Sequence, residues 1–121
     1  MRFLVTGAAG FIGKHIMKRL QKENCIGIDN LNCSNTINGD IRDFEFCKHN
    51  TRGVDVIFHQ AAISSVPRSF LDPKETFEVN VMGFLNVILS SIENGVSKII
   101  YASSSAVYEN DGGIKNEESN L

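Results

Sequence analysis

The sequence predicts an α/β protein in which helices cover both faces of a doubly wound parallel sheet, giving three layers. Short apolar runs typical of buried strands alternate with segments of helical periodicity, which is the pattern of parallel α/β sheets. A glycine-rich turn joins the first strand to the first helix. For a chain of 121 residues we expect a single domain, residues 1–121.

The first half of this domain is predicted to contain three strands and one helix. Arg2 to Val5 forms the first strand, Cys25 to Ile28 the second, and a third lies within Thr36 to Asp40. Because Gly39 follows Asp29 by only ten positions, we expect a vestigial helix or a turn between the second and third strands. The predicted helix has an apolar stripe and a cationic end that suits its dipole. The stripe is Ile12, Ile16 and Leu20, and the cations are Lys18, Arg19 and Lys22.

The second half is predicted to contain a strand over Val54 to Phe58, a long helix and a final strand. Asp72 can cap the helix and Pro73 suits its first position, so we expect a helix from there to about Asn94, ended by Gly95. We expect Lys98 to Ala102 to be a strand buried on both faces. The aperiodic residues 109–121 predict a loop. The apolar face expected for the long helix is Phe77, Val81, Phe84, Leu85, Ile88 and Ile92.

Composition indicates small molecules as partners. The formal net charge of -2 provides no basic field for nucleic acid or anionic lipid, and the interrupted apolar run within Val79 to Ile92 is too short to span a membrane. The three cysteines lack the spacing of a metal or redox motif, so we expect reduced thiols and no metal site. The amino terminus is typical of a strand rather than a signal peptide, so we expect a cytoplasmic protein.

The glycine turn Gly7-x-x-Gly10-x-x-Gly13 predicts a Rossmann-type dinucleotide site, because it follows a strand and opens a helix. Glycines let the backbone approach a pyrophosphate, whose charge is bound by N–H groups at the helix start. Asp29 ends the second strand, where a carboxylate binds ribose hydroxyls and repels the 2′-phosphate of NADP. We therefore expect NAD as cofactor. The alternatives are a turn that serves only packing, and NADP with Lys14 as its partner. Phe11, Ile12 and Asn30 complete the expected contacts of this half.

With these residues placed, the chain resembles the extended short-chain dehydrogenase/reductase family that acts on nucleotide sugars, the NAD-dependent epimerases and dehydratases, over essentially its whole length. Residues 39–43 resemble the family's adenine-binding loop, which implies that Asp40 binds the adenine amino group and Ile41 lines its face. Gln60, Ala61 and Ala62 resemble the stretch beneath the diphosphate and the nicotinamide ribose. Residues 80–83, Asn-Val-Met-Gly, resemble a segment of the family's central helix.

The resemblance also implies catalytic and substrate-binding residues. Residues 103–108 resemble the serine-rich strand end beside the catalytic centre, in which Ser104 would bind the substrate hydroxyl and Ser103 is both a cofactor contact and the nearest alternative. Ser64, Ser65 and Arg68 lie in a loop similar to that of epimerases of UDP-N-acetylhexosamines and their uronic acids, which implies substrate binding. The alternative for Arg68 is a solvated side chain. We interpret His59, at the end of a strand, as structural rather than as a base.

The acid/base pair of this family, Tyr-x-x-x-Lys, does not occur in residues 1–121. Tyr101 is followed four positions later by Ser105, and Tyr108 by Gly112. We therefore expect an N-terminal fragment that ends before the motif, the later strands and the C-terminal substrate domain, and that is inactive alone.

Our leading hypothesis is the NAD-binding part of an epimerase that inverts C4 of a UDP-sugar through a keto intermediate. The alternatives are a nucleotide-sugar dehydratase or decarboxylase, and a non-catalytic dinucleotide-binding module. The unpaired edge of the last strand favours self-association into a homo-oligomer.

Overall fold

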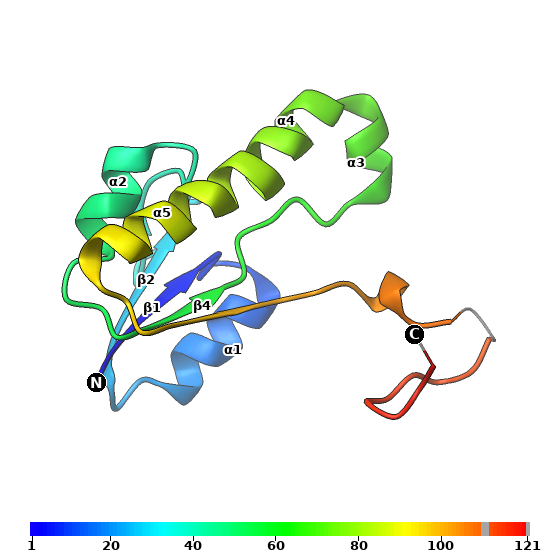
Figure 1. Cartoon of the computed structure of the whole chain (residues 1–121), viewed down its shortest axis with the longest axis horizontal. Coiled ribbons are helices and arrows are strands. Elements are labelled where there is room, and N and C mark those ends of the chain that lie inside the picture. The colour runs from blue at the N-terminus through cyan, green and yellow to red at the C-terminus, as the bar shows by residue number, and fades with distance from the viewer. Residues whose placement is uncertain (110–111, 121) are drawn as a thin grey trace.

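Five parallel strands form one sheet in the computed structural model, which describes residues 1–109 and 112–120. The strands lie in the order β3-β2-β1-β4-β5 (Figure 1), so the chain winds outward from β1 in both directions. This order confirms the predicted doubly wound sheet and places a crevice where the direction reverses, between β1 and β4. The strands are β1 (Arg2–Thr6), β2 (Asn24–Asp29), β3 (Ile37–Asn38), β4 (Val56–His59) and β5 (Lys98–Tyr101).

Helices cover both faces of the sheet. Helix α1 (Phe11–Arg19) lies on one face, and α2 (Phe44–Asn50) and α5 (Phe84–Asn94) lie together on the other (Figure 1). The connection from β2 to β3 contains turns and no helix, which agrees with the vestigial helix or turn expected from its short length. Helix α2 was not predicted from the sequence; the side chain of Asp43 caps it by accepting a hydrogen bond from the N–H of Phe46 over 3.1 Å.

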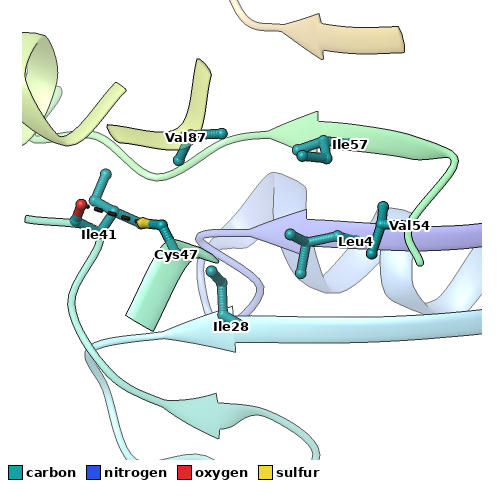
Figure 2. Packing of buried hydrophobic residues seen from close by; sticks show 7 residues of the cluster. All are labelled: Leu4, Ile28, Ile41, Cys47, Val54, Ile57 and Val87. Atoms are coloured by element: carbon teal, nitrogen blue, oxygen red, sulfur yellow. Dashed lines mark hydrogen bonds between the residues drawn. The ribbon is translucent and has the colours of Figure 1, made fainter. Parts of the chain in front are cut away.

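The main core lies between the sheet and the α2 and α5 layer. Strands β1, β2, β4 and β5 contribute aliphatic side chains, and fully burying one such side chain stabilises the fold by about 1.5 to 3 kcal/mol. Burial raises the pKa of the Cys47 thiol to about 12, and it also raises the pKa of Cys25. These thiols are therefore protonated at neutral pH, and the three cysteines are free, as expected. The core residues drawn in Figure 2 are Leu4, Ile28, Ile41, Cys47, Val54, Ile57 and Val87.

The apolar stripe predicted for α1 is correct at Ile16 and Leu20 and wrong at Ile12. Ile16 and Leu20 are half-buried, whereas Ile12 is 55% exposed. Gly13 takes the inward position instead, because a Cβ there would collide with the carbonyl oxygen of Gly7 in the preceding turn. The first turn of α1 therefore packs against the glycine turn through backbone atoms.

The long helix predicted from Asp72 to Asn94 is present but is not a uniform α-helix. It comprises α4 (Pro73–Phe77), a π-helical segment η1 (Glu78–Gly83) and α5. The Asp72 side chain accepts a hydrogen bond from the N–H of Glu75 over 2.9 Å, and Gly95 ends the helix with a φ of 69°. Both predicted ends are therefore confirmed.

The apolar face predicted for this helix is correct at Phe84 and Ile88, which are half-buried, and wrong at its other four residues. The buried residues are Gly83, Val87, Ser90 and Ser91, whereas Ile92 is 71% exposed. A π-helical segment adds a residue to the turn and so rotates the face that follows it. Small residues at the buried positions also let the helix approach its neighbours closely. The predicted residues that are exposed are Phe77, Val81, Leu85 and Ile92.

Two further expectations are corrected. The segment Ser64 to Ser69, expected to be a loop, contains the start of helix α3 (Val66–Leu71). Strand β5 is not buried on both faces, since Tyr101 is 60% exposed and nothing in the described part of the chain lies beyond β5 in the sheet.

After β5 the chain leaves the body of the domain. A short 3-10 turn, η2 (Ser105–Val107), is followed by irregular chain, with bends and a turn at residues 117–118 within residues 112–120. Residues 110, 111 and 121 of the predicted loop lie outside the described residues. No helix of the described chain is long and apolar enough to cross a membrane.

Candidate functional site

A cavity of about 380 Å³ lies at the carboxyl ends of β1, β2 and β4. Its volume is within the range of ~300 to 1,000 Å³ typical of small-molecule sites, and its position beside the strand-order reversal is where doubly wound sheets bind ligands. The cavity is lined by Gly7, Gly10, Ile28, Asp29, Asn30, Leu31, Gly39, Asp40, Ile41, Gln60, Ala61, Ala62, Ile63, Arg68, Glu75 and Val79.

The glycine turn forms one wall of this cavity through its backbone. Gly7 has a φ of 66°, and a Cβ there would lie 2.7 Å from the backbone nitrogen of Ala61, so only glycine fits. The N–H of Gly10 donates to the carbonyl of Gly7 over 3.0 Å and closes the turn. No side chain in the described residues caps α1. The N–H groups of its first turn are thus donors for an anion.

Asp29 connects the end of β2 to the glycine turn. Its Oδ2 accepts a hydrogen bond from the N–H of Ala9, and its Oδ1 accepts one from the N–H of Leu31, each over 2.9 Å. A carboxylate has about four acceptor positions, so two remain for a ligand. This arrangement fixes a negative charge in the cavity wall, beside the turn that would hold a pyrophosphate.

Thr6 and His59 hold the opposite wall in place. The Thr6 hydroxyl oxygen accepts hydrogen bonds from the N–H groups of Gln60 and Ala61, both over 3.2 Å. Its own proton therefore goes to His59 Nδ1, which lies 2.8 Å away, and the proton of the imidazole lies on Nε2. Burial lowers the pKa of His59 to about 4, and its ring stacks on Phe84 at 4.6 Å. His59 is thus a neutral residue that positions the cavity wall, in agreement with its structural interpretation.

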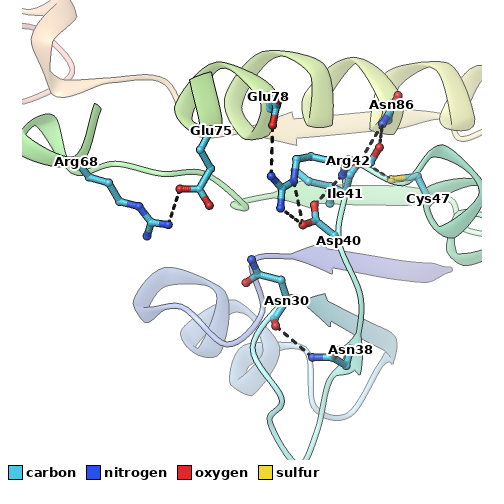
Figure 3. A network of polar contacts seen from close by, with 10 residues as sticks. All are labelled: Asn30, Asn38, Asp40, Ile41, Arg42, Cys47, Arg68, Glu75, Glu78 and Asn86. Atoms are coloured by element: carbon cyan, nitrogen blue, oxygen red, sulfur yellow. Dashed lines mark hydrogen bonds and ion pairs between the residues drawn. The ribbon is translucent and has the colours of Figure 1, made fainter. Parts of the chain in front are cut away.

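Asp40 and Ile41 also line the cavity, and Figure 3 shows them beside Arg42. Arg42 donates to the Asp40 carboxylate through Nη2 at 2.6 Å and Nε at 3.0 Å, and through its backbone N–H at 2.9 Å. The hydrogen bond from the Arg42 side chain lowers the pKa of Asp40, which is therefore ionised at neutral pH. Arg42 also lies 3.5 Å from Glu78. The charge of Asp40 is thus oriented before any ligand binds.

The residues predicted to bind substrate divide into two groups. Arg68 lines the cavity, where its Nη2 donates to Glu75 Oε2 over 2.8 Å (Figure 3). Ser65 does not line it, because its hydroxyl caps α3 by accepting from the N–H of Arg68 at 3.3 Å. Ser64 is exposed and also lies outside the lining. Glu75 shares the wall with Arg68 and was recognised from the sequence only as part of a helix start.

The predicted catalytic serine is not part of the cavity. Ser103 and Ser104 follow β5 and are exposed, and the Ser104 hydroxyl accepts a hydrogen bond from the N–H of Ala106 at 3.2 Å. Phe11 is 82% exposed, and neither Phe11 nor Ile12 lines the cavity. The predicted cofactor residues that the cavity unites are Gly7, Gly10, Asp29, Asn30, Asp40, Ile41, Gln60, Ala61 and Ala62; those outside it are Phe11, Ile12, Gly13 and Ser103.

Asn80 is a site-forming residue whose role was not predicted. Its side chain accepts from the N–H of Ile63 at 2.8 Å and donates to the carbonyl of the same residue at 2.9 Å, so it fixes the backbone that lines the cavity after Ala62. The resemblance of residues 80–83 to a family segment was the sequence feature that could have indicated this role.

Within residues 1–109 and 112–120, no three His, Cys, Asp or Glu side chains gather to hold a metal ion.

Comparison with known proteins assigns the family. The model of the NAD dependent epimerase/dehydratase family matches residues 3–121. The chain belongs to this family. This epimerase/dehydratase chain is 39% identical over 118 residues to a putative UDP-glucose 4-epimerase of Methanocaldococcus jannaschii, a match that covers 87% of the chain and 39% of the relative.

Solved structures share the fold of this epimerase/dehydratase chain. The UDP-glucose 4-epimerase of Thermus thermophilus in complex with NAD is 35% identical with a TM-score of 0.83, over 98% of this chain and 43% of that one. A double mutant of dTDP-glucose 4,6-dehydratase from Streptomyces venezuelae, solved with NAD, is 32% identical with a TM-score of 0.83, over 100% of this chain and 45% of that one. The chain thus spans about two-fifths of the length of these relatives.

Proposed function

We propose that this chain binds NAD in the cavity at the carboxyl ends of β1, β2 and β4. The pyrophosphate would lie on the glycine turn and the start of α1, the adenosine ribose on Asp29, and the adenine against Ile41 and Asp40. The observation that carries the proposal is the Asp29 carboxylate, hydrogen-bonded to Ala9 of the glycine turn and facing the cavity. It joins the ribose acceptor to the phosphate cradle in one rigid unit.

The same carboxylate favours NAD over NADP. A 2′-phosphate would place negative charge next to Asp29, whose two oxygens are held in position by the N–H groups of Ala9 and Leu31 and cannot turn away without losing both hydrogen bonds. Like charges at such close range oppose binding.

Calorimetric titration tests the proposal. We expect heat and saturation with NAD, and binding of NADP at least roughly tenfold weaker, which corresponds to about 1.4 kcal/mol. An absence of heat with NAD at millimolar concentration would disprove the proposal. Equal affinity for NAD and NADP would support the dinucleotide site but disprove the discrimination against NADP assigned to Asp29.

The reaction proposed for the complete enzyme is C4 epimerisation of a UDP-sugar, with NAD as a recycled hydride acceptor. Similarity to UDP-glucose 4-epimerases supports it. Ser104 would bind the reacting hydroxyl, whereas Tyr-x-x-x-Lys is absent from residues 1–121. Loss of a positioned acid/base costs about 10² to 10⁴ in rate, so we expect no epimer from UDP-GlcNAc or UDP-glucose with this chain alone. Turnover would disprove this assignment of catalytic residues.

Two other functions are supported by specific observations. The likeness to a dTDP-glucose 4,6-dehydratase supports a dehydratase. A non-catalytic dinucleotide-binding module is the other alternative, because the cavity unites the expected cofactor-binding residues whereas Ser104 lies outside it. Sequencing the gene past the codon for Leu121 separates enzyme from module, because only the enzyme requires the Tyr-x-x-x-Lys pair.

A further inference from the structure

A hydrogen-bonded contact joins helix α5 to the turn that forms the adenine end of the cavity (Figure 3). The Nδ2 of Asn86 donates to the carbonyl of Ile41 over 3.0 Å and to the carbonyl of Arg42 over 2.9 Å. The thiol of Cys47 donates to the same Ile41 carbonyl over 3.3 Å. One side-chain amide therefore uses both of its protons on two consecutive backbone oxygens.

Close packing brings the helix within reach of this turn. A Cβ on Gly83 would lie 2.7 Å from Cγ1 and Cδ1 of Ile41, so the helix approaches Ile41 as closely as a glycine allows. Ile41 is only 6% exposed and belongs to the core, although its remaining surface lines the cavity. Ile41 lies in the turn after β3, so its position is set by the helix layer behind it rather than by strand pairing.

The two carbonyls that Asn86 binds belong to the turn that follows Asp40 and includes Ile41, both of which line the cavity. Carbonyl oxygens on consecutive residues repel when they converge, and a two-proton donor between them stabilises that backbone conformation. With the backbone in this conformation, Asp40 and Ile41 both line the cavity. Arg42 completes the unit, because its guanidinium holds the Asp40 carboxylate at 2.6 Å and lies 3.5 Å from Glu78.

We propose that Asn86 is a positioning residue for the adenine end of the dinucleotide site, and that it acts through the backbone of Ile41 and Arg42 without touching the ligand. The inference rests on the proposed NAD site. It assigns an indirect role in NAD binding to a residue of helix α5 that does not line the cavity.

The same helix provides a matched control. Asn94 also donates two hydrogen bonds from Nδ2, to the Lys48 carbonyl at 2.9 Å and to the Thr51 hydroxyl at 2.8 Å. Both acceptors lie at the end of α2, outside the cavity lining. Asn94→Ala therefore removes the same number of hydrogen bonds from the same helix as Asn86→Ala, but at a distance from the ligand.

The test compares NAD affinity and local hydrogen exchange in the two variants of the 121-residue chain. With Asn86→Ala we expect roughly tenfold weaker NAD and ADP-ribose binding, the scale of two lost neutral hydrogen bonds, together with faster exchange of the Arg42 and Asp43 amides. With Asn94→Ala we expect wild-type affinity and wild-type exchange at these amides. Asn86→Asp, which keeps the shape but places a carboxylate against the two carbonyl oxygens, should weaken binding at least as much as Asn86→Ala.

The outcomes separate this inference from the function on which it rests. If the wild-type chain binds no NAD, the proposed function fails and the inference fails with it. If the wild type binds and Asn86→Ala binds equally well, or if Asn94→Ala weakens binding to the same degree, only the positioning role is overturned. Unchanged exchange at Arg42 and Asp43 in Asn86→Ala would also overturn it.

Discussion

The Oδ2 of Asp29 accepts a hydrogen bond from the N–H of Ala9 over 2.9 Å, so the end of β2 and the glycine turn after β1 move as one unit. Parallel pairing of β1 with β2 brings them together, with Thr6 opposite Ile28. A carboxylate in this position serves two purposes, because it orders the turn and leaves acceptor positions free for a diol. Substitutions at Asp29 should therefore affect the ligand and the turn together.

Asp29→Asn tests this dual role. The amide keeps the shape but loses the charge and one acceptor, and hydrogen bonds to charged groups contribute about 1.5 to 3 kcal/mol. We expect NAD affinity, measured by calorimetry, to fall roughly 10- to 100-fold, with less discrimination against NADP. Asp55→Asn is the control, since Asp55 accepts the backbone N–H of Arg2 at the opposite end of the sheet; it should leave the Kd unchanged. A wild-type Kd for Asp29→Asn would refute the ribose assignment.

Gly7→Ala should unfold the turn and abolish NAD binding. The residue combines a φ of 66° with backbone atoms of Gln60 and Ala61 that would lie 2.7 Å from an added Cβ, so both strain and collision oppose alanine. Gly95→Ala isolates the strain, because its φ is 69° and nothing lies within 4 Å of the added Cβ. Urea denaturation should show a loss of about 1 to 2 kcal/mol for Gly95→Ala and a larger loss for Gly7→Ala. Equal losses would show that the contact with Ala61 is unimportant.

His59 should make the stability of the fold depend on pH. Burial lowers its pKa in the folded chain to about 4, from an ordinary value of 6.5. Between these values the unfolded chain binds more protons, so the free energy of unfolding falls as the pH is lowered from 6.5 toward 4. At ~1.4 kcal/mol per pKa unit, the free energy of unfolding falls by about 3 kcal/mol over this pH range. Urea denaturation at a series of pH values measures it.

Two variants assign this pH dependence to His59. His59→Asn retains an acceptor for the Thr6 hydroxyl but does not titrate, so its stability should vary less between pH 4 and 6.5 than that of the wild type. His49→Asn removes an exposed histidine and should leave the wild-type slope. The assignment is wrong if His59→Asn keeps the full slope.

The exposed apolar face of the helix and the edge of β5 should cause self-association. Leu85 and Leu89 are 41% and 44% exposed, and they lie between Val81 and Ile92, which are also exposed. Contiguous apolar surface and an unpaired strand edge both favour association. We expect light scattering to show oligomers for the wild type and a monomer for the double variant Leu85→Lys, Leu89→Lys. Ile114→Lys, which changes an apolar residue on the C-terminal segment, should not disperse them. A monodisperse wild-type monomer would contradict this expectation.

The sequence was sufficient for the parts of the fold that local chemistry controls. Gly7 and Gly95 both adopt positive φ, at a turn and at a helix end where glycine was expected. The cap at Asp72 is also local, because its side chain bonds an N–H only three residues away and requires no contact with another helix or strand. The cavity likewise contains Asp29, Asp40 and Gln60, because each follows a strand or lies in a short motif.

The site could not be predicted completely because some of its contacts join residues far apart in the chain. Asn86 binds carbonyls 45 and 44 positions away, and nothing about an isolated asparagine in a helical pattern indicates such partners. Asn80 and Ile63 are a similar case. Ser104 was assigned from the resemblance of residues 103–108 to a family motif, but it lies beyond β5 and outside the cavity. Motif spacing says nothing about that separation.

The sequence by itself determined the parallel sheet, the glycine cradle and the acidic residue beside it, because strand, turn and cap preferences depend on neighbouring residues. Only the tertiary structure decided which face of the long helix is buried. Apolar residues occupy most of its circumference, so periodicity could not choose, and the π-helical segment rotated the face that follows it. Gly83 and Ser90 are buried there, instead of Leu85 and Ile92, because close approach to the layer beneath requires small side chains.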